Sequence, residues 1–196
     1  VSYIISHADE LNVNSSHLVL CGSSAGAITV LQADYELANR RKSYVSVPEG
    51  FRFGGVISFA GAIFSHHGKL KYTRQAPAPT FLLHGKDDFI VTYKKIVCFN
   101  LGFYGTDAMV KLFEKLNYPY FAIRYRNLGH EVASVMKYNV DEIAWFVDNY
   151  VIAKKQLKVD QYYLNPEMKR NPNYPLRPRD LYRKGREMQK NTRRNN

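Results

Sequence analysis

Residues 22–26 of this chain read Gly-Ser-Ser-Ala-Gly and fit the pattern G-x-S-x-G around Ser24. Alone the pattern is weak evidence, because glycine and serine are common residues. Its surroundings strengthen it. Residues 17–21 form a short apolar run typical of a buried strand, and residues 25–39 repeat apolar side chains at helical spacing. A sharp strand-to-helix turn would lift the Ser24 hydroxyl clear of a sheet and would require small residues on both sides of it.

A serine hydroxyl needs an oriented base before it can act as a nucleophile at neutral pH. Two later apolar runs, 80–84 and 121–126, each lead into a polar loop that offers such groups. The first loop contains Asp88 and the second contains His130. Catalytic groups collect where the strands of a parallel sheet end, and the order serine, acid, histidine is the one expected with this turn.

These motifs together resemble those of the α/β-hydrolase esterases and lipases, over residues 1 to about 150. The resemblance rests on the serine turn, on an acid loop and on a histidine loop. In this sequence the last two are His84-Gly85-x-x-Asp88-x-x-Val91 and Gly129-His130.

The resemblance implies a catalytic triad of Ser24, Asp88 and His130. In that mechanism His130 accepts the proton of Ser24, and Asp88 orients the imidazole. One oxyanion donor would be the backbone N–H of Ala25, and a second would come from a loop earlier in the fold. We expect no cofactor and no metal site.

Neighbouring residues compete for these roles. Asp87 adjoins Asp88 and could be the acid instead, although the spacing of the family favours Asp88. Glu131 follows His130 at the start of a predicted helix, where a carboxylate stabilises the helix dipole. We expect His84 to shape the acid loop rather than to act as a base.

The elements that position these residues alternate between strands and helices, which predicts an α/β fold with a parallel sheet flanked by helices. We expect strands at 17–21, 56–60, 80–84 and 121–126. We expect helices at 3–11, 25–39, 92–99, around 109–116 and at 131–153.

The pattern divides the chain at about residue 153. We assign 1–153 to a partial α/β-hydrolase catalytic domain and 154–196 to a basic, proline-containing extension that is partly disordered. The segment resembles only the later strands of the family, so we expect the first four strands and the second oxyanion donor to lie upstream. The strand before Ser24 would then present an unpaired apolar edge and reduce activity and stability.

Composition narrows the class of protein. The formal net charge is +11, but residues 154–196 hold 13 Lys and Arg against 4 Asp and Glu, so the predicted domain is nearly neutral. We therefore expect no nucleic-acid partner. No apolar run is long enough to span a membrane. We expect Cys21 and Cys98 to be buried free thiols.

The predicted function is hydrolysis of a carboxylic ester through an acyl-enzyme intermediate. The short polar and aromatic segment 64–78 leaves little room for a lid and favours a small or carbohydrate-linked ester. Two alternatives stay open: a serine peptidase of the same fold, and a catalytically silent relative that acts as a binding module. The sequence does not determine compartment or oligomeric state.

Overall fold

A computed structural model describes residues 1–39 and 47–164 of the chain. Most of the predicted extension, 165–196, therefore lies outside the described residues. The helices and strands are α1 (Ser2–Ser6), η1 (Ser15–His17), β1 (Val19–Ser23), α2 (Ala25–Asn39), β2 (Gly55–Phe59), β3 (Ala62–Ser65), β4 (Thr80–Gly85), β5 (Lys95–Cys98), β6 (Leu101–Gly105), α3 (Thr106–Leu116), β7 (Tyr120–Tyr125), η3 (His130–Ser134), η4 (Met136–Tyr138), α4 (Val140–Phe146), η5 (Val147–Ile152) and β8 (Lys158–Tyr163).

The main sheet has the strand order β1-β2-β4-β7-β8, and every neighbouring pair is parallel. Its three central strands are buried along their whole length. Continuous apolar runs belong in such strands because helices cover both faces of a parallel sheet. The prediction of an α/β fold with a parallel sheet is confirmed.

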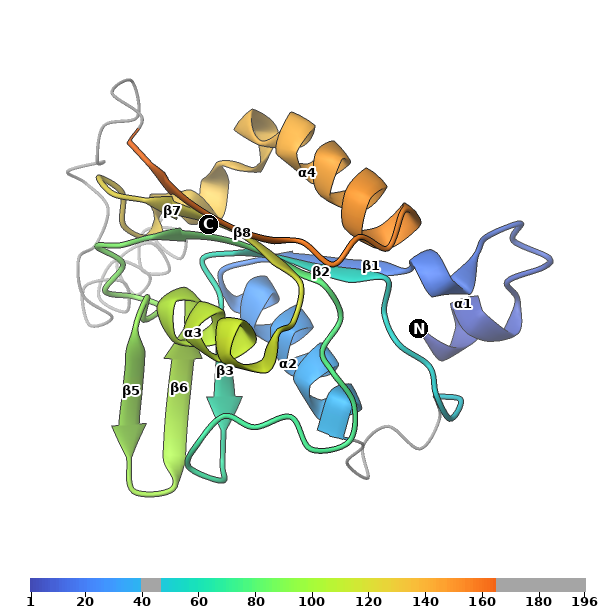
Figure 1. Cartoon of the computed structure of the whole chain (residues 1–196), viewed down its shortest axis with the longest axis horizontal. Coiled ribbons are helices and arrows are strands. Elements are labelled where there is room, and N and C mark those ends of the chain that lie inside the picture. The colour runs from blue at the N-terminus through green and yellow to red at the C-terminus, as the bar shows by residue number, and fades with distance from the viewer. Residues whose placement is uncertain (40–46, 165–196) are drawn as a thin grey trace, which may run out of the picture.

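Helices lie on both faces of this sheet, as Figure 1 shows, with α4 on one side and α2 and α3 on the other. Side chains alternate along each strand and so divide the core in two. On β4, Leu82 packs into the cluster that α2 and α3 cover, whereas Phe81 packs into the cluster beneath α4. The Phe81 ring stacks on Phe121 of β7 at 4.4 Å between centroids. The parallel strands are thereby held between two apolar layers.

A second, antiparallel sheet of order β3-β6-β5 projects below the main sheet in Figure 1. The sequence did not predict it, and the expected helix at 92–99 is wrong. Residues 95–98 are instead the strand β5, which forms a hairpin with β6. Ile96 and Val97 are β-branched and suit a strand better than a helix.

The long helix expected at 131–153 is also wrong in its first part. This segment forms two short 3₁₀ helices, η3 and η4, before α4 begins at Val140 and continues into the π-helix η5. Asn139 lies at the break and is buried, and its side chain pairs with the hydroxyl of Tyr125 at 3.0–3.1 Å. Asn139 directly precedes α4 as its N-cap residue, and its carbonyl accepts the N–H of Ile143 at 2.9 Å.

The two edges of the main sheet differ from expectation. Residues 158–163, placed in the extension, form β8 and pair in parallel with β7, so the sheet continues beyond residue 153. At the other edge, β1 pairs only with β2 among the described strands and is only partly buried.

Cys21 of β1 and Cys98 of β5 are exposed, so the prediction of buried thiols is wrong. Both thiols lie on edge strands, where neighbours do not cover them.

Helix α1 is shorter than the predicted helix at 3–11 and ends at Ser6. Across the described ranges, no helix combines the length and apolarity needed to cross a bilayer.

Candidate active site

The turn between β1 and α2 holds Ser24 in a left-handed backbone conformation, with φ of +52°. This conformation is costly for a residue with a side chain, by about 1–3 kcal/mol. The Ser24 N–H donates to the carbonyl of Phe59 at 2.9 Å, which fixes the turn against the end of β2. The Ser24 hydroxyl is thereby presented at the carboxyl end of the sheet.

Only one of the two flanking glycines is required by contacts among the described residues. A Cβ added to Gly22 would lie 2.3 Å from the carbonyl oxygen of Gly26, so the turn cannot close over a larger residue there. A Cβ on Gly26 would meet no atom within 4 Å. The expectation that backbone passes close to both glycines is therefore wrong for Gly26.

The three predicted side chains form one continuous hydrogen-bonded chain, although up to 106 residues separate them along the sequence. Ser24 Oγ lies 2.7 Å from His130 Nε2, and His130 Nδ1 lies 2.7 Å from Asp88 Oδ2. An ionised carboxylate only accepts, so Nδ1 carries the ring proton and the unprotonated Nε2 can accept the hydrogen bond of the Ser24 hydroxyl. This tautomer is the one that a general base for Ser24 requires.

Each member of the chain follows a strand of the main sheet. Ser24 follows β1, Asp88 lies in the loop after β4, and His130 begins η3 after β7. The loops touch because β4 and β7 are neighbours in the sheet. Gly85 allows their close approach, since a Cβ there would lie 2.2 Å from the carbonyl oxygen of Gly129.

The Asp88 carboxylate is buried and multiply hydrogen-bonded. Its Oδ1 accepts the N–H groups of Ile90 and Val91 at 2.8 and 3.0 Å. Burial by itself raises the pKa of Asp88, but hydrogen bonds from His130 and His84 outweigh it and lower the pKa to about 2. Asp88 is therefore ionised at neutral pH, as the partner of an imidazolium should be.

The carboxylates of Asp87 and Glu131, which adjoin Asp88 and His130 in the sequence, are not part of this hydrogen-bonded chain as described. The Asp87 side chain is exposed, and the described hydrogen bond of this residue is made by its backbone N–H. The Glu131 carboxylate accepts the N–H of Gly129 at 2.7 Å and so stabilises the histidine loop. The geometry therefore favours Asp88 over Asp87 as the acid.

Two contributions to the site were not found from the sequence. The Ser23 hydroxyl donates to the carbonyl of Ala133, which ties the serine turn to the histidine loop. His84 lies behind Asp88 and contacts Thr106 of α3. No spacing in the sequence signals the contact of Ser23 with Ala133 or that of His84 with Thr106, because these partners come from distant elements, whereas His84 and Asp88 are only four residues apart.

Ala25 is the first residue of α2 and is exposed. The first four N–H groups of a helix have no partner within the helix, and they point at whatever lies before the N-terminus. An oxyanion formed at a carbonyl bonded to Ser24 would lie in this region.

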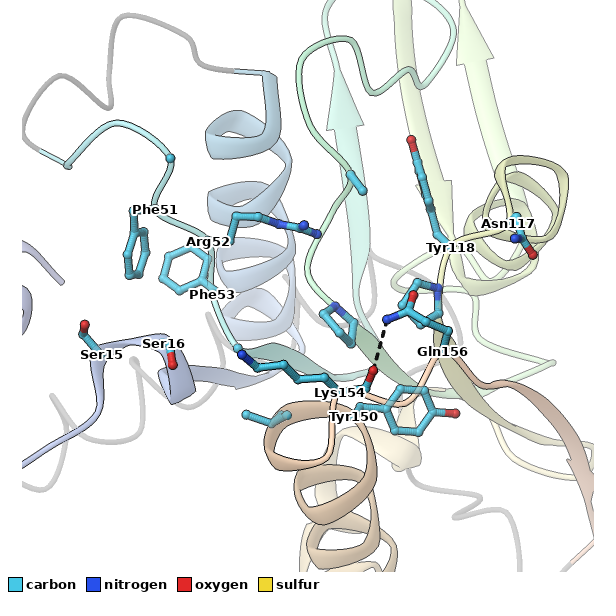
Figure 2. A pocket seen from close by; sticks show the side chains of 16 residues that line it. Ser15, Ser16, Phe51, Arg52, Phe53, Asn117, Tyr118, Tyr150, Lys154 and Gln156 are labelled. Atoms are coloured by element: carbon cyan, nitrogen blue, oxygen red, sulfur yellow. Dashed lines mark hydrogen bonds between the residues drawn. The ribbon is translucent and has the colours of Figure 1, made fainter.

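A hollow of about 500 Å³ lies at the opposite end of the sheet (Figure 2). Gly54, Pro79 and Pro119, which line it, each directly precede a strand, so the hollow is at the amino ends of β2, β4 and β7. Lys154 and Gln156 are among the lining residues, and Figure 2 marks the hydrogen bond of 3.3 Å from Gln156 Nε2 to the Lys154 carbonyl. None of Ser24, Asp88 or His130 lines it.

In the described ranges, no three His, Cys, Asp or Glu side chains gather as a metal site. Comparison of the chain with models of protein families, with curated proteins and with solved structures finds no match.

Proposed function

We propose that this chain is a serine hydrolase of the α/β-hydrolase type that cleaves a carboxylic ester through an acyl-enzyme intermediate. The observation that supports it most is the hydrogen-bonded chain from Ser24 through His130 to a buried, ionised Asp88. The parallel sheet supports it too, because each of the three groups follows the carboxyl end of a strand.

In the proposed reaction, Ser24 Oγ attacks the ester carbonyl carbon while its proton moves to His130 Nε2. The tetrahedral oxyanion is met by the N–H of Ala25. The carbon–oxygen bond to the alcohol then breaks, and the imidazolium gives its proton to the leaving alkoxide. Water repeats these steps on the acyl-enzyme and releases the carboxylic acid and free Ser24.

The segment that follows β3 favours a small or carbohydrate-linked ester over a long-chain triglyceride. The segment between β3 and β4 is short, and His66, His67 and Lys69 are exposed on it. A short, polar segment of this kind favours a small or carbohydrate-linked ester as the substrate.

The test is covalent labelling by a fluorophosphonate, followed by mass spectrometry of the modified peptide. We expect one adduct on Ser24 and a loss of labelling in Ser24→Ala. The matched control is Ser134→Ala, an exposed serine of η3, which should label like the unmodified chain.

Turnover of p-nitrophenyl acetate and of a peptidyl anilide then separates ester from amide hydrolysis. We expect the ester to be cleaved faster. Labelling that persists in Ser24→Ala would contradict the assigned nucleophile. The absence of labelling in a folded chain would instead favour a silent binding module.

A further inference from the structure

His84 is fully buried behind the triad acid and makes hydrogen bonds on both sides of its ring. Its Nε2 lies 3.2 Å from Asp88 Oδ2 and also 3.2 Å from the carbonyl oxygen of Val91. Both of these partners are acceptors, so Nε2 must carry a proton. On the other side, Nδ1 lies 3.0 Å from the hydroxyl of Thr106, which can donate to it. These partners favour the tautomer of His84 that carries its proton on Nε2.

The same Asp88 oxygen therefore receives two imidazole donors. His130 donates to Oδ2 at 2.7 Å and His84 donates to it at 3.2 Å. A hydrogen bond to a carboxylate stabilises its ionised form and reduces its attraction for a further proton. His84 should thus weaken the attraction between the Asp88 carboxylate and a protonated His130.

We propose that His84 is a positioning residue of this site, which fixes the Asp88 carboxylate and shares its Oδ2 with His130, so that the imidazolium is not held too tightly to return its proton to the leaving group. Thr106, at the start of α3, contacts Nδ1 and so holds the other side of the His84 ring. The kinetic consequence rests on the proposed function, whereas the hydrogen-bond arrangement does not.

The members of this arrangement come from strand β4, from helix α3 and from the loop between β4 and β5, and they are buried together. His84 is in β4, Thr106 opens α3, and the ring of Tyr93 meets the His84 ring edge-on at 5.6 Å. Thr106 and Tyr93 are both buried. The Tyr93 hydroxyl accepts from Arg124 at 2.8 Å. Arg124 also donates to the carboxylates of Asp107 and Asp160. The other ionisable groups nearby are Asp87 in the acid loop and Glu131 in the histidine loop. The variants proposed below leave all of these in place.

The first test is nuclear magnetic resonance of the chain labelled with ¹⁵N-histidine at pH 8. Signals are assigned from their loss in His84→Phe and in His130→Gln. We expect His84 in the Nε2–H tautomer and His130 in the Nδ1–H tautomer. Finding His84 in the Nδ1–H tautomer would overturn the inference, whether or not the chain hydrolyses an ester.

The second test is the pH dependence of kcat with p-nitrophenyl acetate. In His84→Phe we expect kcat to fall about three- to tenfold and the midpoint of the acid limb to rise by about 0.5–1 pH unit, because the Asp88 carboxylate loses one of its two imidazole donors. His84→Gln keeps a donor and should move the midpoint less. A purely structural role would leave the midpoint in place or lower it, and either result would overturn the inference.

Thr106→Val and Thr106→Ser provide a matched pair that keeps the His84 ring, should His84→Phe fail to fold. We expect both variants to retain the Nε2–H tautomer, because Asp88 and the Val91 carbonyl still accept from Nε2. Thr106→Val removes the hydroxyl beside Nδ1 and should shift the ¹⁵N signal of that nitrogen, whereas Thr106→Ser should leave it in place. An unshifted Nδ1 signal in Thr106→Val would contradict the role of Thr106. If the unmodified chain shows neither labelling nor turnover, the proposed function fails, and the tautomers alone decide this inference.

Discussion

At the scale of single residues, the site depends on which carboxylate faces His130. Asp87 and Asp88 are adjacent in the sequence, yet only Asp88 is turned inward, where two backbone N–H groups and two imidazoles surround it. Its pKa of about 2 keeps it charged throughout the neutral range. The orientation of one side chain thus separates the proposed acid from a solvated neighbour.

Replacing Asp88 by asparagine should remove most of the hydrolytic activity. An amide at this position can donate to Nδ1 of His130 and so stabilise the tautomer whose Nε2–H cannot accept the Ser24 proton. We expect kcat for p-nitrophenyl acetate, or the rate of fluorophosphonate labelling, to fall by roughly 10³–10⁴-fold. Asp87→Asn is the matched control and should lie within about twofold of the unmodified chain. The opposite ranking of the two variants would assign the acid to Asp87.

At the scale of elements, close backbone contacts decide how the loops meet. The turn from β1 to α2 closes only because Gly22 has no side chain to meet Gly26. The acid loop and the histidine loop meet in the same way at Gly85 and Gly129. A Cβ at Gly22 or at Gly85 would have to displace backbone, which is more costly than moving the end of a flexible side chain.

The two glycines of the serine turn should therefore respond differently to alanine. Gly22→Ala forces an overlap at 2.3 Å with a carbonyl oxygen, and we expect it to lower the free energy of unfolding by about 2–4 kcal/mol and to abolish labelling of Ser24. Gly26→Ala lies in helix α2 with no atom nearby and should change stability by less than about 1 kcal/mol. Urea denaturation followed by circular dichroism measures both. Equal losses in the two variants would show that another contact covers Gly26.

At the scale of the whole molecule, one buried carboxylate should make stability depend on pH. Asp34 of α2 accepts the N–H of Ala78 through both oxygens, at 3.2 and 3.1 Å, and so ties the helix to the chain that enters β4. Burial raises the pKa of Asp34 to about 7, against the lowering effects of Ala78 and Arg52. Below pH ~4, Asp34 is protonated in both the folded and the unfolded state and imposes no penalty.

Between pH ~4 and 7 the unfolded chain loses the proton of Asp34 while the folded chain keeps it, so stability should fall as pH rises through this window. The loss is at most roughly 4 kcal/mol. Asp34→Asn retains an acceptor for Ala78 and should remove this slope and stabilise the chain at pH 8. Urea midpoints measured from pH 4 to 8 test it, with the exposed Asp9→Asn as control. An unchanged slope in Asp34→Asn would show that the carboxylate ionises freely in the folded chain.

Much of the fold could be predicted because a parallel sheet imposes local patterns. The runs that became β1, β2, β4 and β7 are apolar since both of their faces are covered, and α2 was expected at the bounds it has. The hairpin of β5 and β6 and the break at Asn139 could not be predicted in this way. The first involves pairing with β3, and at the second Asn139 is buried against Tyr125, 14 residues away, so both involve contacts that local sequence does not specify.

By itself, the sequence determined the order of the candidate groups, Ser24, Asp88 and His130, and their places after apolar runs, because the type of residue and its distance from a strand are local properties. Only the tertiary structure decided that these groups touch, that Asp88 rather than Asp87 faces the imidazole, and that His84 and Thr106 stand behind it. Contacts of this kind depend on which strands are neighbours in the sheet. Neighbouring strands such as β4 and β7 are joined by 34 intervening residues, and nothing in the local sequence specifies their pairing.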